Sequence, residues 1–564
     1  MLLKQVFTSL GIAALACTLV MLSSCGILDT EDENPTITLT GDNPDTIRVN
    51  DPYNEPGWSA SDPEDGDLTS AVTVNYGSLD TASAAVGTYT ITYSVTDNGG
   101  NTATASRIVV VVDSRVTITG TSLASCPVTF ADTQVIYAIT SNLTITGGCS
   151  VTFGAHTKTY VEANIKVEQG GELTILEGAS FYFDDGNYID VGGNGNGTLK
   201  IKGTADDSVL LANLTAGTRW GYGSSATYSG GLWFDDGATA QCSLTYCIID
   251  SATSGMYVSE ASVTISHCRI SNGSYFGCYF DDGGMPKDSS GFFENVITGN
   301  AEYGIGIHAN YAGALSGTGS VAGNNKGGIL IEQDAVEQDA VWKKHDASYV
   351  VDGSIKVESA SGATLTIRPG ARFELKEGAY FDVGESEEGT LIAEGTEIDS
   401  IVFTSYSSGT AWGYGSSATY SGGIWIDDFA TSNTSLKYCV IDSATTGIYI
   451  VDASVAVSNC RIADNTWFGI YFDDGGTPVD SAGFVDNTIT GNGEYGVGMH
   501  ANFVGALSGT GFIAGNTNGG ILIEGDAVES DAVWKSHDAA YVVDGAVKVE
   551  SAGGVTLAIR PGTR

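Results

Sequence analysis

Three side-chain types suited to acid–base chemistry recur at fixed spacing in this chain. Tyr279 and Asp281 are two residues apart, and His308 follows further along. A tyrosine, a carboxylate and an imidazole can move a proton to or from a substrate when they share one site. An equivalent set, Tyr471, Asp473 and His500, occurs 192 residues later. Because the set occurs twice, it fits a repeated binding surface better than a single active site.

Aromatic residues recur on a series of short predicted strands. Each strand reads glycine, apolar residue, any residue, apolar residue, and the series starts at Gly231, Gly255, Gly277, Gly304 and Gly328. The third residue of each strand points outward, since alternate residues of a strand face opposite sides. The outward aromatic residues are Trp233, Tyr257 and Tyr279, with Trp425, Tyr449 and Tyr471 in the repeat.

Stacked strands would align these rings beside a second, acidic stripe that contains Asp281 and Asp473. Exposed rings suit stacking on the apolar faces of sugars, and carboxylates suit hydroxyl groups or calcium. We therefore expect the two stripes to bind a glycan. The alternative is that the long loops starting at Thr218 cover the rings, which then only pack.

The glycine-led strands belong to a block of 192 residues that is written twice. WGYGSSATYSGG occupies residues 220–231 and returns unchanged at residues 412–423. Within the block the strands recur every 22 to 27 residues, which is typical of the coils of a β-solenoid. The residues up to Arg564 match the opening of a third copy, so we expect the native product to continue through most of another block.

The plainest solenoid strands are GELTILEGASFYFDDG from Gly171, GATLTIRPGARFELKEG from Gly362 and GGVTLAIRPGTR from Gly553. They resemble right-handed parallel β-helix proteins of the pectin-lyase-like superfamily. The resemblance implies an all-β chain with a long right-handed parallel β-helix over residues 114–564. It leaves function open, because this fold hosts lyases, hydrolases, epimerases, adhesins and inert spacers.

The catalytic motifs of that superfamily are incomplete in this chain. Tyr279, Asp281 and His308 resemble the acid and base groups of alginate epimerases and lyases, but the family's contiguous tyrosine-glycine-phenylalanine-aspartate-proline-histidine motif is absent. FDDGG at residues 280–284 and 472–476 resembles one element of polygalacturonases, without its partner motifs. A polysaccharide lyase, epimerase or hydrolase is the alternative to a binding protein, and a purely structural stalk is the second alternative.

Cysteines occupy a stacked position in the solenoid. Cys247, Cys268 and Asn295 each precede an inward isoleucine by two residues, and asparagine there resembles the ladders of the superfamily. Stacked cysteines would lie about 4.8 Å apart, close enough for a disulfide, although a ladder of free thiols fits equally. The disulfide candidates are Cys247 with Cys268, Cys439 with Cys460, and Cys126 and Cys149.

Residues 36–113 form a separate unit of alternating strands, a predicted β-sandwich. YNEPGWSASDPEDGDLT from Tyr53 and TYTITYSVTDNGGNTA from Thr88 resemble the bacterial Ig-like domain of pesticidal crystal proteins and many surface proteins. The resemblance implies a spacer or interaction module. One loop carries four acidic residues that can hold calcium, or can form a solvated acidic turn: Asp62, Glu64, Asp65 and Asp67.

The first residues indicate export. Lys4 precedes an apolar run, residues 6–22, that is too short for a membrane span, so we expect a signal peptide over residues 1–24. Leu22-Ser23-Ser24-Cys25 resembles the lipobox of bacterial lipoproteins, which implies lipidation of Cys25. Residues 25–35 then form an acidic linker, and residues 29–33 resemble the tags that direct some Gram-negative lipoproteins to the outer surface.

The net charge of −43 argues against nucleic-acid binding and suits an extracellular location. We therefore expect an outer-membrane, lipid-anchored protein that faces the cell exterior. Its expected partner is an extracellular polysaccharide or a host or matrix glycan. The only cofactor that the residues suggest is calcium, and the ligand and the oligomeric state stay open.

Overall fold

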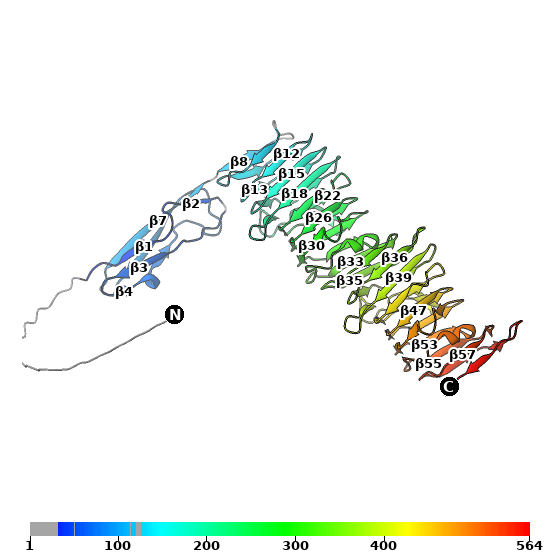
Figure 1. Cartoon of the computed structure of the whole chain (residues 1–564). Coiled ribbons are helices and arrows are strands. Elements are labelled where there is room, and N and C mark those ends of the chain that lie inside the picture. The colour runs from blue at the N-terminus through cyan, green and yellow to red at the C-terminus, as the bar shows by residue number, and fades with distance from the viewer. Residues whose placement is uncertain (1–31, 50, 113, 120–125) are drawn as a thin grey trace, which may run out of the picture. The chain divides into compact units, whose positions relative to one another are not determined.

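The computed structural model describes residues 32–49, 51–112, 114–119 and 126–564 (Figure 1). The chain divides into two compact units, Met1–Ser114 and Arg115–Arg564. Both are built from strands, and the described helices are three short 3-10 turns, η1 (Thr69–Ala71), η2 (Ala309–Ala314) and η3 (Ala501–Ala506). Within the described ranges no helix has the length and apolar character needed to cross a membrane.

The first unit is a sandwich of two sheets. One sheet consists of β1 (Thr36–Leu39), β3 (Trp58–Asp62) and β4 (Gly66–Asp67), and the other of β2 (Asp45–Arg48), β7 (Thr102–Val112), β6 (Gly87–Thr96) and β5 (Thr73–Asn75). Alternate residues such as Ile91, Tyr93 and Val109 face the shared core. The buried Arg107 side chain pairs with Glu55 at 3.1 Å, which compensates its charge inside the sandwich.

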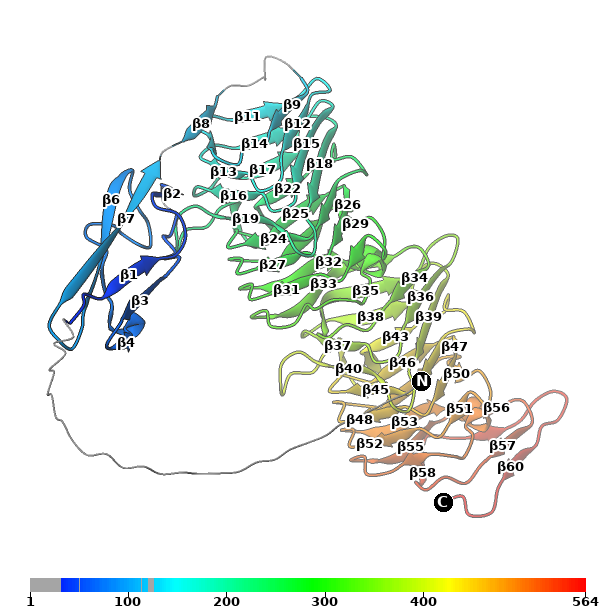
Figure 2. The ribbon, with the colours of Figure 1, turned by 60° about the vertical axis from the view of Figure 1, so that its left-hand side comes forward.

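The second unit is a parallel β-solenoid of about 18 turns, whose strands stack in parallel from one coil to the next (Figure 2). The first copy contributes three stacks of strands, here called faces one, two and three. Face one is β8 (Arg115–Ile118), β10 (Ile136–Ile139), β13 (Lys158–Val161), β16 (Ser180–Phe183), β19 (Val209–Asn213), β24 (Cys247–Asp250), β27 (Arg269–Ser271) and β31 (Val296–Thr298). Face two is β11 (Leu143–Ile145), β14 (Ile165–Val167), β17 (Ile189–Val191), β22 (Leu232–Phe234), β25 (Met256–Ser259), β28 (Cys278–Asp281) and β32 (Tyr303–His308). Face three is β9 (Val128–Phe130), β12 (Ser150–Phe153), β15 (Gly171–Leu176), β18 (Gly197–Lys202), β23 (Ser243–Thr245), β26 (Ser262–Ser266), β29 (Met285–Pro286) and β30 (Phe292–Phe293).

The second copy repeats this arrangement. Face one is β37 (Arg372–Leu375), β40 (Ile401–Ser405), β45 (Cys439–Asp442), β48 (Arg461–Ala463), β52 (Thr488–Thr490) and β54 (Phe512–Ile513). Face two is β38 (Tyr380–Val383), β43 (Ile424–Ile426), β46 (Ile448–Val451), β49 (Ile470–Asp473), β53 (Tyr495–His500), β55 (Gly519–Glu524) and β58 (Tyr541–Asp544). Face three is β34 (Ala340–Trp342), β36 (Ala363–Ile367), β39 (Gly389–Glu394), β44 (Ser435–Lys437), β47 (Ser454–Ser458), β50 (Thr477–Pro478) and β51 (Phe484–Val485). The last pairs are β56 (Ala527–Val528) with β59 (Lys548–Val549) and β57 (Ala532–Trp534) with β60 (Leu557–Ile559).

Each copy also carries an antiparallel hairpin inserted before a face-two strand. The hairpins are β20 (Tyr222–Ser225) with β21 (Tyr228–Gly230), and β41 (Tyr414–Ser417) with β42 (Tyr420–Gly422). They lie within the repeated sequence WGYGSSATYSGG. The hairpins are therefore part of the duplicated unit rather than local irregularities.

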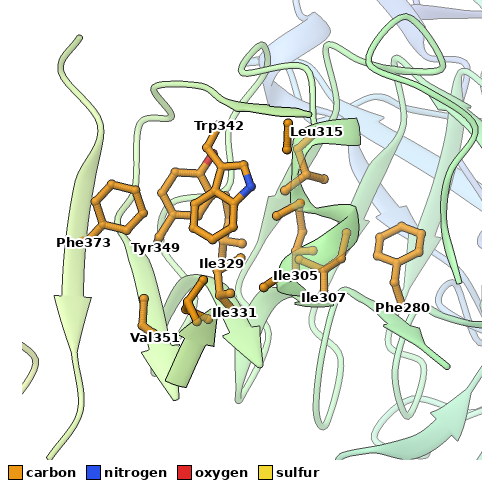
Figure 3. Packing of buried hydrophobic residues seen from close by; sticks show 14 of the residues in the cluster. Phe280, Ile305, Ile307, Leu315, Ile329, Ile331, Trp342, Tyr349, Val351 and Phe373 are labelled. Atoms are coloured by element: carbon orange, nitrogen blue, oxygen red, sulfur yellow. The ribbon is translucent and has the colours of Figure 1, made fainter. Parts of the chain in front are cut away.

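At the junction of the two copies, the stack of strands that begins on face two of the first copy leads to face one of the second copy. Ile305 and Ile307 of β32 pair with Ile329 and Ile331 of β33 (Gly327–Val336). These pair with the start of β35 (Tyr349–Val357), which in turn pairs with β37 on face one of the second copy, while the end of β35 pairs with β38 on face two. The core stays continuous across this junction, where the rings of Trp342, Tyr349 and Phe373 stack on one another (Figure 3).

The predicted asparagine and cysteine positions stack as polar ladders. Asn295 Oδ1 accepts a hydrogen bond from the Cys268 amide at 2.9 Å. A second ladder, which we did not expect, links Asn300 to Asn324 at 2.8 Å. Cys126 and Cys149 form a disulfide. The disulfide alternative is wrong for the stacked pairs, because Cys247, Cys268, Cys439 and Cys460 are buried free thiols that fill the core.

The junction makes Trp342 a sensitive position. Its side chain is fully buried, so Trp342→Ala should remove about 3 to 5 kcal/mol from the free energy of unfolding. Ile398→Ala is the control, because Ile398 is 91% exposed and its loss should change stability by less than about 0.5 kcal/mol. Urea unfolding of the two variants measures the difference, and equal effects would contradict this account of the junction.

Candidate functional site

The predicted aromatic stripe forms on face two. Parallel pairing places Trp233 beside Tyr257 and Tyr257 beside Tyr279. The ring centroids are 4.1 Å apart for the first pair and 6.1 Å for the second. The equivalent distances in the second copy, for Trp425, Tyr449 and Tyr471, are 4.3 and 5.7 Å. The spacing of one coil on the next therefore brings these rings into contact.

The stripe is not an open surface. Trp233, Tyr257 and Tyr279 are 5%, 4% and 3% exposed, and Trp425, Tyr449 and Tyr471 are similarly buried. Tyr222 and Tyr228 of the hairpin meet the Trp233 ring edge to face at 5.5 and 4.8 Å. The expectation that the stripe stacks directly on sugars is therefore wrong. The alternative, in which the loop covers the rings, describes Trp233 and Tyr257, whereas the Tyr279 ring packs against Phe276.

The hairpins expose other aromatic residues in place of the stripe. Tyr222 is 45% exposed and Tyr228 is 53% exposed. Their counterparts Tyr414 and Tyr420 are 46% and 56% exposed. Sequence reasoning missed all four as candidates, although the identical hairpin sequence in both copies is a signal that could have found them.

The predicted acid–base residues also come together. His308 Nε2 lies 3.5 Å from Asp281 Oδ1 and 3.6 Å from Glu332 Oε2. The Tyr257 hydroxyl donates to Asp281, and the Tyr279 hydroxyl donates to Glu332, both at 2.8 Å. The second copy repeats the cluster with Tyr449, Tyr471, Asp473, His500 and Glu524.

The protonation states in this cluster do not suit proton abstraction. The hydrogen bond to Asp281 raises the pKa of His308 above its usual value, so the imidazole favours its charged form. Burial, together with Glu332, raises the pKa of Tyr279, so the phenol keeps its proton. Asp281 contacts Tyr257 and His308 in the coils on either side, and Tyr279 reaches Glu332 two coils away. The cluster therefore ties coils together through hydrogen bonds and ion pairs.

A pocket of about 210 Å³ lies at the edge of the stripe in the first copy. The residues that line it, here called the first site, are Tyr188, Asp190, Tyr222, Tyr228, Trp233 and Asp235. β17 and β22 position the two aspartates, because Asp190 pairs in register with Trp233. The volume is below that of a drug-sized pocket, so the site suits a group of about the size of one sugar ring.

Both carboxylates of the first site face the same space. An ideal Cβ built on Gly193 would lie 2.8 Å from Asp190 Oδ1 and 3.2 Å from Asp235 Oδ2. Lys166 Nζ lies 3.5 Å from Asp190 Oδ2, and the Trp233 indole donates to Asp235 Oδ1 at 3.1 Å. Asp190 is 8% exposed, and its Oδ1 has no hydrogen-bond partner within the described residues. Burial raises the pKa of both carboxyls.

The second copy holds the same rings around a different set of charges. The second site consists of Tyr380, Asp382, Tyr414, Tyr420, Trp425 and Asp427, each 192 residues after its counterpart. Asp382 is 5% exposed and its Oδ1 likewise lacks a partner in the described part of the chain. Burial raises the pKa of Asp382 to about 7 and that of Asp427 to about 6.

The cause of this difference lies in three contacts. Glu385 stands where the first copy has Gly193, and it pairs with Lys356. Lys356 also lies 3.8 Å from Glu358. The Trp425 indole donates to the carbonyl of Gly422 instead of to an aspartate. Asp382 and Asp427 therefore lose the direct lysine and indole partners that their first-copy counterparts keep.

The four acidic residues considered for calcium lie in one turn that their side chains help to hold by hydrogen bonds. Asp62 Oδ1 accepts hydrogen bonds from the amides of Glu64 and Asp65. The Asp65 carboxylate accepts hydrogen bonds from Asn98, and Asp67 accepts one from the Thr69 amide. Across the described residues, no group of three acidic, histidine or cysteine side chains is arranged to hold a metal ion. Cys25, the predicted lipid site, lies outside the described residues.

Two family models match the chain. Residues 37–111 match a bacterial surface protein Ig-like domain. Residues 202–366 and 386–528, together more than half of the chain, match the right-handed β-helix region. No curated protein matches the chain. The matches confirm the predicted fold of both units, and the second match covers most of the residues of both candidate sites.

The raised pKa of Asp382 predicts pH-dependent stability. The folded state favours the protonated carboxyl, because its pKa is about 7 instead of 3.8. Ionisation of this buried carboxyl therefore destabilises the folded state. The destabilisation is absent below about pH 4, where the carboxyl is protonated in both the folded and the unfolded state, and it grows as the pH rises toward 7. Asp382→Asn should therefore raise the thermal unfolding midpoint at pH 8 and leave it nearly unchanged at pH 4.

The matched control for this measurement is Asp428→Asn, because Asp428 is exposed in the turn that follows β43. It should leave the midpoint nearly unchanged at both pH values. A gain of equal size at pH 4 and pH 8 for Asp382→Asn would contradict the proposed penalty.

Proposed function

The chain belongs to the right-handed β-helix family, and we propose that it uses this scaffold to bind an extracellular glycan. The first and second sites are the binding sites. In this proposal the protein is anchored by lipid at Cys25 to the bacterial outer membrane and faces the cell exterior, and it acts as an adhesion or glycan-binding protein rather than as an enzyme.

The observation that carries the proposal is the pocket between the hairpin and face two. Half-exposed tyrosines stand at its edge, and carboxylates with raised pKa lie beneath them. Tyrosine rings stack on the apolar faces of sugars, and carboxyl groups bond to hydroxyl groups. The second copy repeats the rings and aspartates. Two weak sites on one rigid rod would bind a repeating polymer with avidity.

Two features support a location at the cell surface. The N-terminal unit matches an Ig-like domain of bacterial surface proteins. The sequence before it has the apolar run and the Leu22-Ser23-Ser24-Cys25 motif of a lipoprotein leader. The net charge of −43 also suits a solvated extracellular protein that does not bind nucleic acid.

The tyrosines of the hairpins provide a test of glycan binding. Tyr222→Ala with Tyr228→Ala removes the exposed rings of the first site, and Tyr414→Ala with Tyr420→Ala removes those of the second. Loss of stacking at about 1 kcal/mol per ring should weaken binding by about tenfold or more when all four are changed. Binding of the full chain in detergent to immobilised glycans measures the effect.

Phe512→Ala is the control, because Phe512 is 49% exposed and lies outside both sites. It should leave glycan binding unchanged. If the wild-type chain binds no glycan on a broad array, the glycan-binding proposal fails and the structural stalk is favoured.

The lipid anchor is tested separately. Cys25→Ala removes the only thiol of the Leu22-Ser23-Ser24-Cys25 motif, so the variant should accumulate as a precursor or appear in the soluble fraction. The wild-type chain should need detergent for release from membranes. Identical fractionation of the processed variant and the wild type would rule out lipidation at this residue.

A further inference from the structure

The charges of the two sites restrict the ligand. The residues that line the first site include two aspartates and no lysine or arginine. The nearest lysine, Lys166, is already paired with Asp190. A ligand that carries a carboxylate or sulfate would meet like charge without a compensating cation. The first site therefore disfavours acidic sugars and suits a ligand that brings positive charge.

One carboxylate oxygen of each buried aspartate lacks a donor. Asp190 and Asp382 are more than nine-tenths buried, and each has one carboxylate oxygen with no hydrogen-bond partner within the described residues. A buried acceptor without a partner costs free energy, and more so when it is charged. The same orphan oxygen occurs in both copies, on the residue that lies beneath the hairpin tyrosines. A ligand with a cationic group that donates a hydrogen bond would satisfy this oxygen.

The aromatic rings favour the same kind of ligand. In the first site the Tyr222 and Tyr228 rings stand at 80° and 78° to Trp233. In the second site Tyr414 and Tyr420 stand at 75° and 82° to Trp425. Rings that meet at steep angles present both edges and faces to the neighbouring space, and an ammonium group is attracted to the faces.

We propose that both sites bind the protonated amino group of an amino sugar, and that the second site binds it more tightly than the first. This inference rests on the glycan-binding function proposed above. In the first site Lys166 competes with the ligand for Asp190. In the second site Lys356 is drawn to Glu385 and Glu358, and the Trp425 indole is turned to Gly422. Asp382 and Asp427 therefore remain available to a ligand cation.

The test compares two oligosaccharides of equal length on the full chain in detergent. One consists of glucosamine, which carries free amino groups, and the other of N-acetylglucosamine, which is neutral. Hydrogen bonds to a charged partner contribute more than neutral ones, so glucosamine oligomers should bind about tenfold more tightly or better. Calorimetric titration at pH 7 and 0.15 M salt measures both affinities.

Charge-neutral variants identify the site. Asp382→Asn with Asp427→Asn should remove most of the preference for glucosamine, and Asp190→Asn with Asp235→Asn should remove a smaller part. Lys166→Gln should strengthen binding at the first site, because it frees Asp190. The control is Asp206→Asn with Asp207→Asn, since both residues are exposed and the change removes the same charge. It should leave the preference intact, which excludes general attraction to an acidic chain.

The outcomes separate this inference from the proposed function. Equal affinity for the two oligomers, or an equal loss with the control pair, overturns the amino-sugar inference. If the neutral oligomer still binds and the four hairpin tyrosines are still required, the glycan-binding function stands without it. If neither oligomer nor any other glycan binds, both proposals fail. Circular dichroism of each asparagine variant establishes that the fold is retained.

Discussion

Parallel pairing of each coil on the next is the constraint from which the other features of the solenoid follow. The backbone hydrogen bonds hold equivalent residues of successive coils at the spacing of two strands. Side chains of one position therefore form a column, whether they point inward or outward. Trp233, Tyr257 and Tyr279 contact one another because β22, β25 and β28 pair in register. The same constraint stacks the asparagines and the thiols.

The hairpin covers part of the outward column of large rings. A continuous aromatic stripe on the surface would expose apolar area to water. The hairpin of β20 and β21 lays Tyr222 and Tyr228 over Trp233, and the rings below become almost fully buried. The cover is incomplete at its edge, where Tyr188, Asp190 and Asp235 leave a pocket. The candidate site is thus a consequence of how the stripe is covered.

Duplication placed the same rings and aspartates in both copies. The strands, the hairpin and the four aromatic positions are the same in both copies. The loop after the buried aspartate differs between the copies, and one of its changes, Glu385 in place of Gly193, supplies a carboxylate that pairs with Lys356. Burial, together with the nearby Glu385 carboxylate, raises the pKa of Asp382 to about 7. Charge can therefore vary between copies while the scaffold is unchanged, since the varied side chains lie outside the core.

Periodicity alone was enough to predict the architecture. Glycine-led strands every 22 to 27 residues and a repeat of 192 residues identify a solenoid, because a period-two pattern assigns each residue to one face. The pattern likewise predicted the contacts among Trp233, Tyr257 and Tyr279. The cluster of Asp281 with His308 was also foreseen, since both lie on outward positions of neighbouring strands.

Only the tertiary structure decided which outward residues reach solvent. Strand periodicity tells inside from outside, but it does not tell whether another segment lies on top. The hairpin that buries Trp233 is folded back by contacts that no local pattern encodes. For the same reason Asp190 was overlooked, because its burial depends on a ring and a lysine from other coils. The sequence by itself determined the coils and their columns, and the packing of inserted segments determined the site, since burial is a property of neighbours distant in the chain.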